Sequence, residues 1–208
     1  LRGKGTLFDR GTHVPLMIRW PGHIDPGSSS SALVCGTDLG PTILAACGMR
    51  PLQKMTGVSF LPQLMGGKFA GREYVFAERG WHWGPITRSD GLDLSRSITS
   101  QRYRYIYNAL PDRRYTPVDM SGKDAWKAIQ AAHAEKELSP LHERLYFVNP
   151  RPIIELYDLR NDPLELENLA GNTKVANIER SLREELESWM IREHDFLPLP
   201  THALRNAK

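Results

Sequence analysis

Residues 3–22, GKGTLFDRGTHVPLMIRWPG, are the stretch of this 208-residue chain that decides the expected fold. Their apolar part, residues 14–20, is closed by Pro21 and Gly22, and its short length and its flanks favour a buried β-strand over a helix. Ahead of this run, Lys4 lies between two glycines in a loop, from which its ammonium group can extend toward a phosphate or sulfate oxygen. Taken alone, a lysine in a loop is more often a solvated surface residue.

A helix is expected after the strand. Thr37 or Asp38 can cap it, Pro41 fits its first turn and Gly48 ends it. Its apolar positions recur at helical spacing, so the helix should pack against the strand. A second apolar strand is expected at residues 73–77, EYVFA, with a loop after it.

The pattern changes after Gly91. Residues 94–99 and 102–108 are two β-prone runs that predict an antiparallel hairpin, with tyrosines alternating on one face of the second strand. Three further elements follow, each with the apolar spacing of its type: a helix within 121–137, a strand at 155–159 and a helix over 173–193.

These elements predict an α/β fold in two parts. Residues 1–90 would be the end of a larger α/β sheet layer. Residues 91–208 would form a small antiparallel sheet with a packed C-terminal helix.

Composition excludes several classes. The 27 Lys+Arg and 24 Asp+Glu are interspersed, which gives no electrostatic footprint for nucleic acid, and 40% hydrophobic residues indicate a globular chain. No apolar run reaches the roughly 20 residues of a membrane span, and residues 1–20 lack the apolar block of a signal peptide. Cys35 and Cys47 are too few for a metal cluster and are expected to be buried free thiols.

His82 is a second candidate for binding. It lies between Trp81 and Trp83, so it could contact a sugar, or it could simply pack within an aromatic cluster. The histidines show no metal-ligand spacing, and the sequence contains no Gly-x-Ser-x-Gly, no P-loop and no dinucleotide fingerprint. The chain therefore offers an anion-binding lysine but no nucleophile with an identifiable base.

Taken together, residues 3–22 resemble a segment in the C-terminal half of the type I sulfatases. In that family a lysine is followed, in order, by an aromatic residue, an acidic residue, a glycine, Val-Pro, an apolar strand and Trp-Pro-Gly. Three further blocks agree in order and spacing: residues 37–44 (TDLGPTIL), 57–64 (GVSFLPQL) and 155–170 (ELYDL, then DP and ENLA). Within the family the chain most resembles heparan N-sulfatases (sulfamidases) and their bacterial relatives, through Glu78-Arg79-x-x-His82, the hairpin around Tyr105, and residues 189–195.

The resemblance implies an alkaline-phosphatase-like hydrolase that removes sulfate esters or N-sulfate groups from a sulfated sugar such as a glycosaminoglycan. In that family a Cys or Ser becomes formylglycine, whose hydrate attacks sulfur while calcium and basic residues hold the sulfate. Lys4 matches the family's sulfate lysine and is expected to bind substrate and assist catalysis. His82 matches a histidine near the sugar end of the pocket. Periplasmic, lysosomal or secreted locations are also implied.

The chain differs from the family pattern in the residues that carry out catalysis. The nucleophile motif and the calcium ligands are absent from it, and neither Cys35 nor Cys47 lies in a Cys-x-Pro-x-Arg motif. We therefore expect a fragment that is inactive alone and needs the remaining N-terminal sulfatase part or a partner chain. A non-catalytic module that binds sulfated carbohydrate is the alternative.

Overall fold

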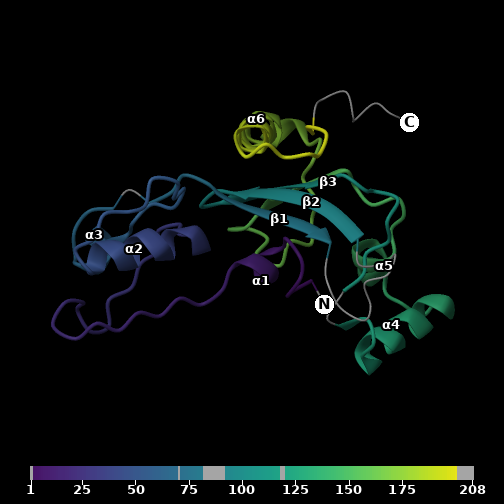
Figure 1. Cartoon of the computed structure of the whole chain (residues 1–208). Helices are drawn as coiled ribbons and strands as arrows, with labels where there is room; N and C mark the ends of the chain where they lie inside the picture. The colour runs from purple at the N-terminus through teal and green to yellow at the C-terminus, as the bar shows by residue number, and fades with distance from the viewer. Residues whose placement is uncertain (1, 70, 82–91, 118–119, 201–208) are drawn as a thin grey trace. The chain divides into compact units, whose positions relative to one another are not determined.

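The computed structural model describes residues 2–69, 71–81, 92–117 and 120–200, and the side chain of Trp81 is not among the parts it describes. The chain divides into two compact units (Figure 1). Unit 1 comprises Leu1–Val14 and Phe76–Lys208, and unit 2 comprises Pro15–Val75. The first 14 residues therefore pack with the later part of the chain. The division into domains at residue 90 stays a prediction.

Unit 1 is built on a four-stranded sheet whose order is β1-β2-β3-β4. Its strands are β1 (Val75–Trp81), β2 (Leu92–Thr99), β3 (Tyr103–Asn108) and β4 (Ile154–Asp158). β2 pairs with β3 and β3 with β4, both antiparallel, with Thr99 opposite Arg104 and Arg104 opposite Tyr157. The predicted hairpin and the predicted strand at 155–159 are confirmed.

β1 corrects one expectation. Residues 78–81 were expected in a loop, but β1 continues through them and joins the small sheet next to the hairpin. The charged residues Glu78 and Arg79 do not end the strand, because successive side chains of a strand point to opposite faces. Glu78 is exposed, whereas Arg79 points inward and contacts the Asp93 carboxylate at 3.0 Å. An inward charge is tolerated in a strand when it has such a partner.

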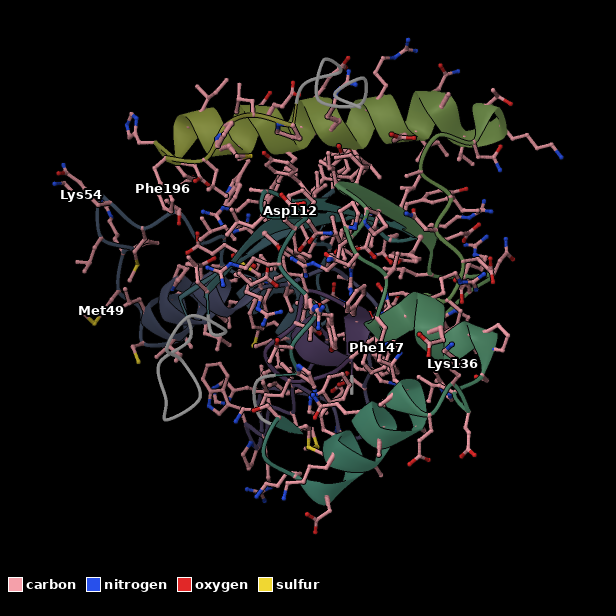
Figure 2. All side chains as sticks on the ribbon, turned by 90° about the vertical axis from the view of Figure 1, so that its right-hand side faces the viewer. Met49, Lys54, Asp112, Lys136, Phe147 and Phe196 are labelled. Carbon is pink, nitrogen blue, oxygen red and sulfur yellow. The ribbon has the colours of Figure 1, made fainter. Side chains whose placement is uncertain are left out.

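α6 (Ala176–Arg192) covers one face of the sheet, as the helix prediction over 173–193 required, and Figure 2 shows side chains filling the layer between them. Leu182, Leu186 and Met190 are buried, each worth about 1.5–3 kcal/mol of transfer free energy. Glu179 of the same helix is also buried although it is charged, because its carboxylate accepts the Gly171 N–H at 2.8 Å.

Two short helices follow the hairpin, α4 (Asp124–Ala134) and α5 (Pro140–Tyr146). α4 confirms the helix expected within 121–137, whereas α5 was not predicted. Trp126 is the buried residue of α4, and its ring stacks on Phe147, labelled in Figure 2, with centroids 5.7 Å apart. Because Ser139 caps α5 by accepting the His142 N–H, even this seven-residue helix has a defined start.

Unit 2 contains a 3₁₀ turn, η1 (Gly36–Asp38), and the helices α2 (Leu39–Ala46) and α3 (Leu61–Leu64). The expected helix is confirmed, but the Asp38 side chain does not cap it. The carboxylate of Asp38 is fully buried and accepts the N–H groups of Cys35 and Val58 at 2.9 and 2.7 Å. Arg72 adds a bidentate pair to it, which joins three separate segments of this unit.

The strand predicted at residues 14–20 is wrong for this structure. The segment is irregular, Val14 is 68% exposed and Met17 90% exposed. Among the described residues no strand pairs with it, and a strand cannot form without neighbours to take its backbone hydrogen bonds. The buried thiols were also mispredicted: Cys35 is half-buried and Cys47 exposed, both free. Within the described ranges, no helix has the length and apolar character needed to cross a membrane.

The Asp38 cluster predicts how unit 2 responds to mutation and acid. Burial acts to raise the pKa of Asp38, but the hydrogen bonds from Arg72, Val58 and Cys35 outweigh it and lower the pKa. Stabilisation is therefore present above the unfolded value of about 3.9 and is lost as pH falls through the folded value.

We expect Asp38→Asn to cost about 3 kcal/mol at pH 7, because it leaves the Arg72 charge without its partner. Urea unfolding of the complete protein measures this, with Asp25→Asn in an exposed loop as the matched control. The difference from wild type should shrink at pH 3, and a difference that stays constant between pH 7 and pH 3 would contradict the assignment.

Candidate functional site

Lys4 lies at the exposed tip of a tight turn. The Thr6 N–H donates to the Gly3 carbonyl at 3.0 Å, and the Thr6 hydroxyl donates to the same oxygen at 2.6 Å. Gly5, the third residue of the turn, has φ +81°, a conformation that side chains with a Cβ rarely adopt. The turn therefore fixes the backbone on both sides of Lys4.

The short helix α1 (Asp9–Thr12) packs directly against this turn through Gly11. A Cβ atom added at Gly11 would lie 2.3 Å from the Thr6 carbonyl oxygen and 2.6 Å from that of Gly3. Both neighbours are backbone atoms that cannot move aside cheaply. A glycine at this position is thus what lets the helix and the Lys4 turn approach each other.

Arg104 anchors the segment that follows the turn. Its buried guanidinium donates to the Leu7 carbonyl at 3.2 Å, to Asp9 at 3.1 Å and to Glu165 at 3.1 Å. The Asp9 N–H also donates to Glu165 at 2.7 Å. Burial raises the pKa of Glu165, although Arg104 opposes this. Residues 7–9 are consequently held against β3 by charge-assisted hydrogen bonds.

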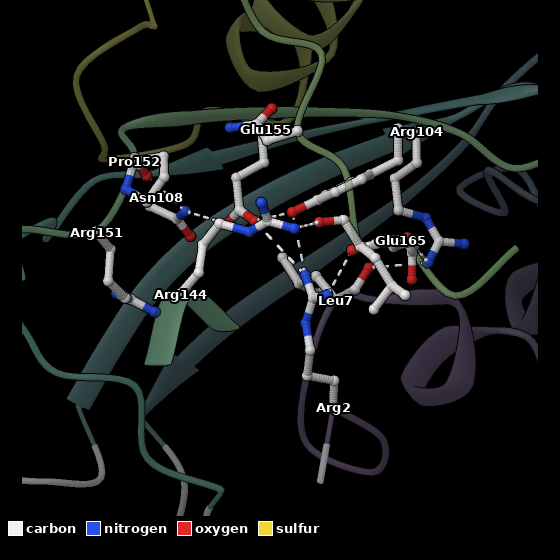
Figure 3. Close-up of polar contacts among 12 residues, drawn as sticks. Arg2, Leu7, Arg104, Asn108, Arg144, Arg151, Pro152, Glu155 and Glu165 are labelled. Carbon is white, nitrogen blue, oxygen red and sulfur yellow. Dashed lines mark hydrogen bonds and ion pairs between the residues drawn. The ribbon is translucent and has the colours of Figure 1, made fainter. Parts of the chain in front are cut away.

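The same face of the sheet borders a cavity of about 190 Å³ in unit 1. Figure 3 shows the polar contacts on this face, with the cavity residues Arg144, Arg151 and Asn108 on one side and Arg104 with Glu165, which do not line the cavity, on the other. Residues 6–8, just after the Lys4 turn, form part of the wall. The remaining lining residues come from all four strands, α5 and three loops: Arg79, Asp93, Ser95, Ile106, Asn108, Tyr115, Arg144, Leu145, Val148, Arg151, Pro152, Glu155, Tyr157, Leu166, Glu167 and Asn168.

Two ionic groups dominate the cavity wall. In the first, Arg79 and Arg151 both contact Asp93, at 3.0 and 2.6 Å. In the second, Glu155 accepts the Asn108 amide at 2.7 Å and the Tyr157 hydroxyl, and lies 3.7 Å from the Arg2 guanidinium.

Tyr157 stays protonated in this setting. Its burial, together with the charge of Glu155, raises its pKa above the ordinary tyrosine value. Its hydroxyl is therefore a hydrogen-bond donor to Glu155, and burial likewise raises the pKa of Tyr115 in the same wall. Neither hydroxyl would serve as a base near neutral pH.

A metal site is not apparent in the part of the chain that the structure describes. No group of three or more His, Cys, Asp or Glu side chains there could hold an ion. The acidic groups of the cavity are already engaged by arginines, so these residues do not fit a calcium site.

The two site residues predicted from sequence have different outcomes. Lys4 is exposed on a well-defined turn beside the cavity wall, whereas His82 lies outside the described residues. Sequence reasoning missed Arg79, Asp93 and Arg151. The sequence carries a signal for two of them. Arg79 and Asp93 each occupy a strand position whose side chain points inward, where a charge needs a partner of opposite sign.

Comparison with known proteins agrees with the sulfatase resemblance. The model of the family described as N-sulphoglucosamine sulphohydrolase, C-terminal, matches residues 3–145. An ulvan-active sulfatase of Formosa agariphila is 30% identical over 99% of this chain and 33% of its own length. Human N-sulphoglucosamine sulphohydrolase is 29% identical over 93% of this chain and 39% of its own length. The chain thus spans about a third of these relatives.

Solved structures show the same fold. A protein in complex with its substrate D-glucosamine-2-N,6-O-disulfate aligns with a TM-score of 0.58 at 20% identity, over 88% of this chain and 29% of the other. A phosphonate monoester hydrolase from Silicibacter pomeroyi aligns with a TM-score of 0.59 at 20% identity, over 93% and 32%.

The predicted α/β class, with its small antiparallel sheet and packed C-terminal helix, is confirmed by these folds and by the observed strands. The resemblance inferred from four ordered sequence blocks is confirmed by the family match. The chain belongs to the N-sulphoglucosamine sulphohydrolase C-terminal family and corresponds to the C-terminal part of a sulfatase.

Proposed function

We propose that the complete protein hydrolyses sulfate esters or sulfamates of a sulfated sugar, and that this chain supplies Lys4 to the sulfate. The supporting observation is the Lys4 turn: Gly5 shapes it, Gly11 allows α1 to pack against it, and Arg104 holds the residues after it. Two relatives support the substrate class, the ulvan-active sulfatase and the human N-sulphoglucosamine sulphohydrolase. They also favour an enzyme over a non-catalytic binding module.

In this mechanism Lys4 acts by electrostatics. An ammonium group is a compact charge with three donors, suited to the oxygens of a sulfate group. As the bond to the sugar breaks, negative charge grows on the oxygen or nitrogen that leaves sulfur, so a fixed cation beside the sulfate group stabilises the transition state more than the bound substrate. The rigid turn matters because a preorganised donor needs little rearrangement during the reaction.

The other parts of the reaction would come from outside this chain. Formylglycine and calcium, which the family resemblance implies, would be supplied by the rest of the sulfatase. His82 stays a prediction for the sugar end of the pocket. We infer that the complete protein works in the periplasm, in lysosomes or outside the cell.

Unit 2 supports the need for that remaining part. Many of its large apolar side chains are exposed, among them Met17, Ile43, Met49, Leu52, Val58 and Met65. Single exposed hydrophobic residues are ordinary, but such a collection on a unit of this size indicates a surface that other protein covers. We propose that the N-terminal sulfatase part, or a partner chain, covers it.

The first prediction from this proposed function concerns the lysine itself. In the complete protein, Lys4→Ala should lower kcat/KM for a sulfated glucosamine substrate about 10²- to 10³-fold, the usual loss of one transition-state donor. Release of sulfate is measured for an N-sulfated and an O-sulfated substrate in parallel. Lys54→Ala, an exposed lysine of unit 2, is the control and should keep wild-type turnover. Unchanged turnover in Lys4→Ala would remove Lys4 from the mechanism.

A second prediction concerns the glycine behind the turn. Gly11→Ala should reduce kcat/KM as well, because the new methyl group collides with the backbone oxygens of Gly3 and Thr6 and displaces Lys4. Gly36→Ala is the matched control, since a Cβ there meets no atom within 4 Å. Turnover and melting temperature are measured together. Wild-type values of both in Gly11→Ala would show that the packing against the turn is wrong.

A further inference from the structure

The wall of the cavity carries more positive than negative charge at one place. Arg151 makes a bidentate contact with Asp93 at 2.6 and 3.1 Å, and Arg79 approaches the same carboxylate at 3.0 Å. All three side chains are at least nine-tenths buried, with 8–10% of their surface exposed. Two guanidinium groups thus share one carboxylate away from bulk water.

Among the described residues, the nearby acids do not supply the missing negative charge. Glu155 is engaged by Asn108, Tyr157 and Arg2, and Glu167 pairs with Arg144 at 2.6 Å at the exposed rim. Glu165 and Asp9 are held by Arg104 at the other end of the face.

The donors of the two arginines are also incompletely used. The Nε atoms of Arg79 and Arg151 are both buried, and the described residues provide no hydrogen-bond acceptor for either. A buried donor without an acceptor costs about 1–3 kcal/mol, and more when it is charged. Both arginines line the cavity, so a group that entered it could accept from them.

We propose that this cavity is a subsite for an anionic group, a sulfate or a carboxylate, bound between Arg79 and Arg151. An oxyanion would balance the excess charge and offer acceptors to the two unused N–H groups. The volume of about 190 Å³ exceeds that of several waters, at about 30 Å³ each, so a substituent of this size fits.

The position of the cavity suggests where that group comes from. Residues 6–8 line it and directly follow the Lys4 turn. The subsite would therefore hold a second anionic substituent of a sugar chain whose reacting sulfate meets Lys4. This identification of the ligand rests on the proposed function, whereas the anion site itself does not.

Selenate, a sulfate analogue visible by anomalous scattering, tests the site directly. Crystals of the complete wild-type protein soaked in selenate should show an anomalous peak between Arg79 and Arg151. A parallel soak in glucuronate shows whether a sugar carboxylate also binds there. An empty cavity in both soaks would overturn the proposal, and this result does not depend on any variant folding.

Variants then assign the binding to the arginines. Arg151→Gln leaves Arg79 and Asp93 as a neutral pair, so it should weaken selenate binding at this site about tenfold or more, the loss expected for a charge-assisted hydrogen bond. Arg180→Gln, at an exposed position of α6 that does not line the cavity, is the control and should bind as wild type. Equal binding in Arg151→Gln and wild type would refute the assignment.

Turnover separates this proposal from the proposed function. The subsite should still bind selenate in Lys4→Ala, whose Arg79 and Arg151 are intact. A protein that binds selenate in the cavity but releases no sulfate from any sulfated sugar would contradict the proposed function alone.

Discussion

The contacts of Arg104 support the rest of the candidate site. This one buried guanidinium on β3 reaches the Leu7 carbonyl, Asp9 and Glu165, and so joins three distant parts of the sequence. Its fixed fork of donors suits such a junction, which a lysine could not reproduce. Because residues 7–9 are anchored here, the turn before them has a fixed base. Lys4 can then be exposed and still be accurately placed.

Both faces of the sheet of unit 1 combine apolar packing with buried charges. The face under α6 has Ile98, Tyr105 and Leu156 fully buried and also holds the buried pair of Arg96 and Asp195. The opposite face carries the ion pairs of Arg79, Arg104 and Arg151. Apolar burial on the first face stabilises the sheet without directional demands. On the second face each buried charge needs a partner of opposite sign. We therefore interpret the unbalanced charge of Arg79 and Arg151 as a binding site for a ligand and not as a contribution to stability.

Much of unit 1 could be predicted from sequence because its signals are local. The alternation in residues 102–108 and the apolar spacing of α6 each specify an element and its buried face. The strand at 14–20 could not be predicted correctly, because a strand depends on partners that the pattern of its own residues does not contain. The burial of Glu179 and Arg79 could not be predicted for a related reason, because each side chain depends on a partner outside its own helix or strand, Gly171 or Asp93.

Hydrogen exchange of the complete protein tests most directly whether Arg104 fixes the segment that presents Lys4. The amides of Thr6 and Asp9 are hydrogen-bonded to Gly3 and Glu165, so a peptide covering residues 3–12 should exchange slowly in the wild type. In Arg104→Gln the same peptide should exchange much faster, while peptides of α6 change little. Exchange of the wild-type peptide at the rate of an unstructured chain, or no acceleration in Arg104→Gln, would contradict this account.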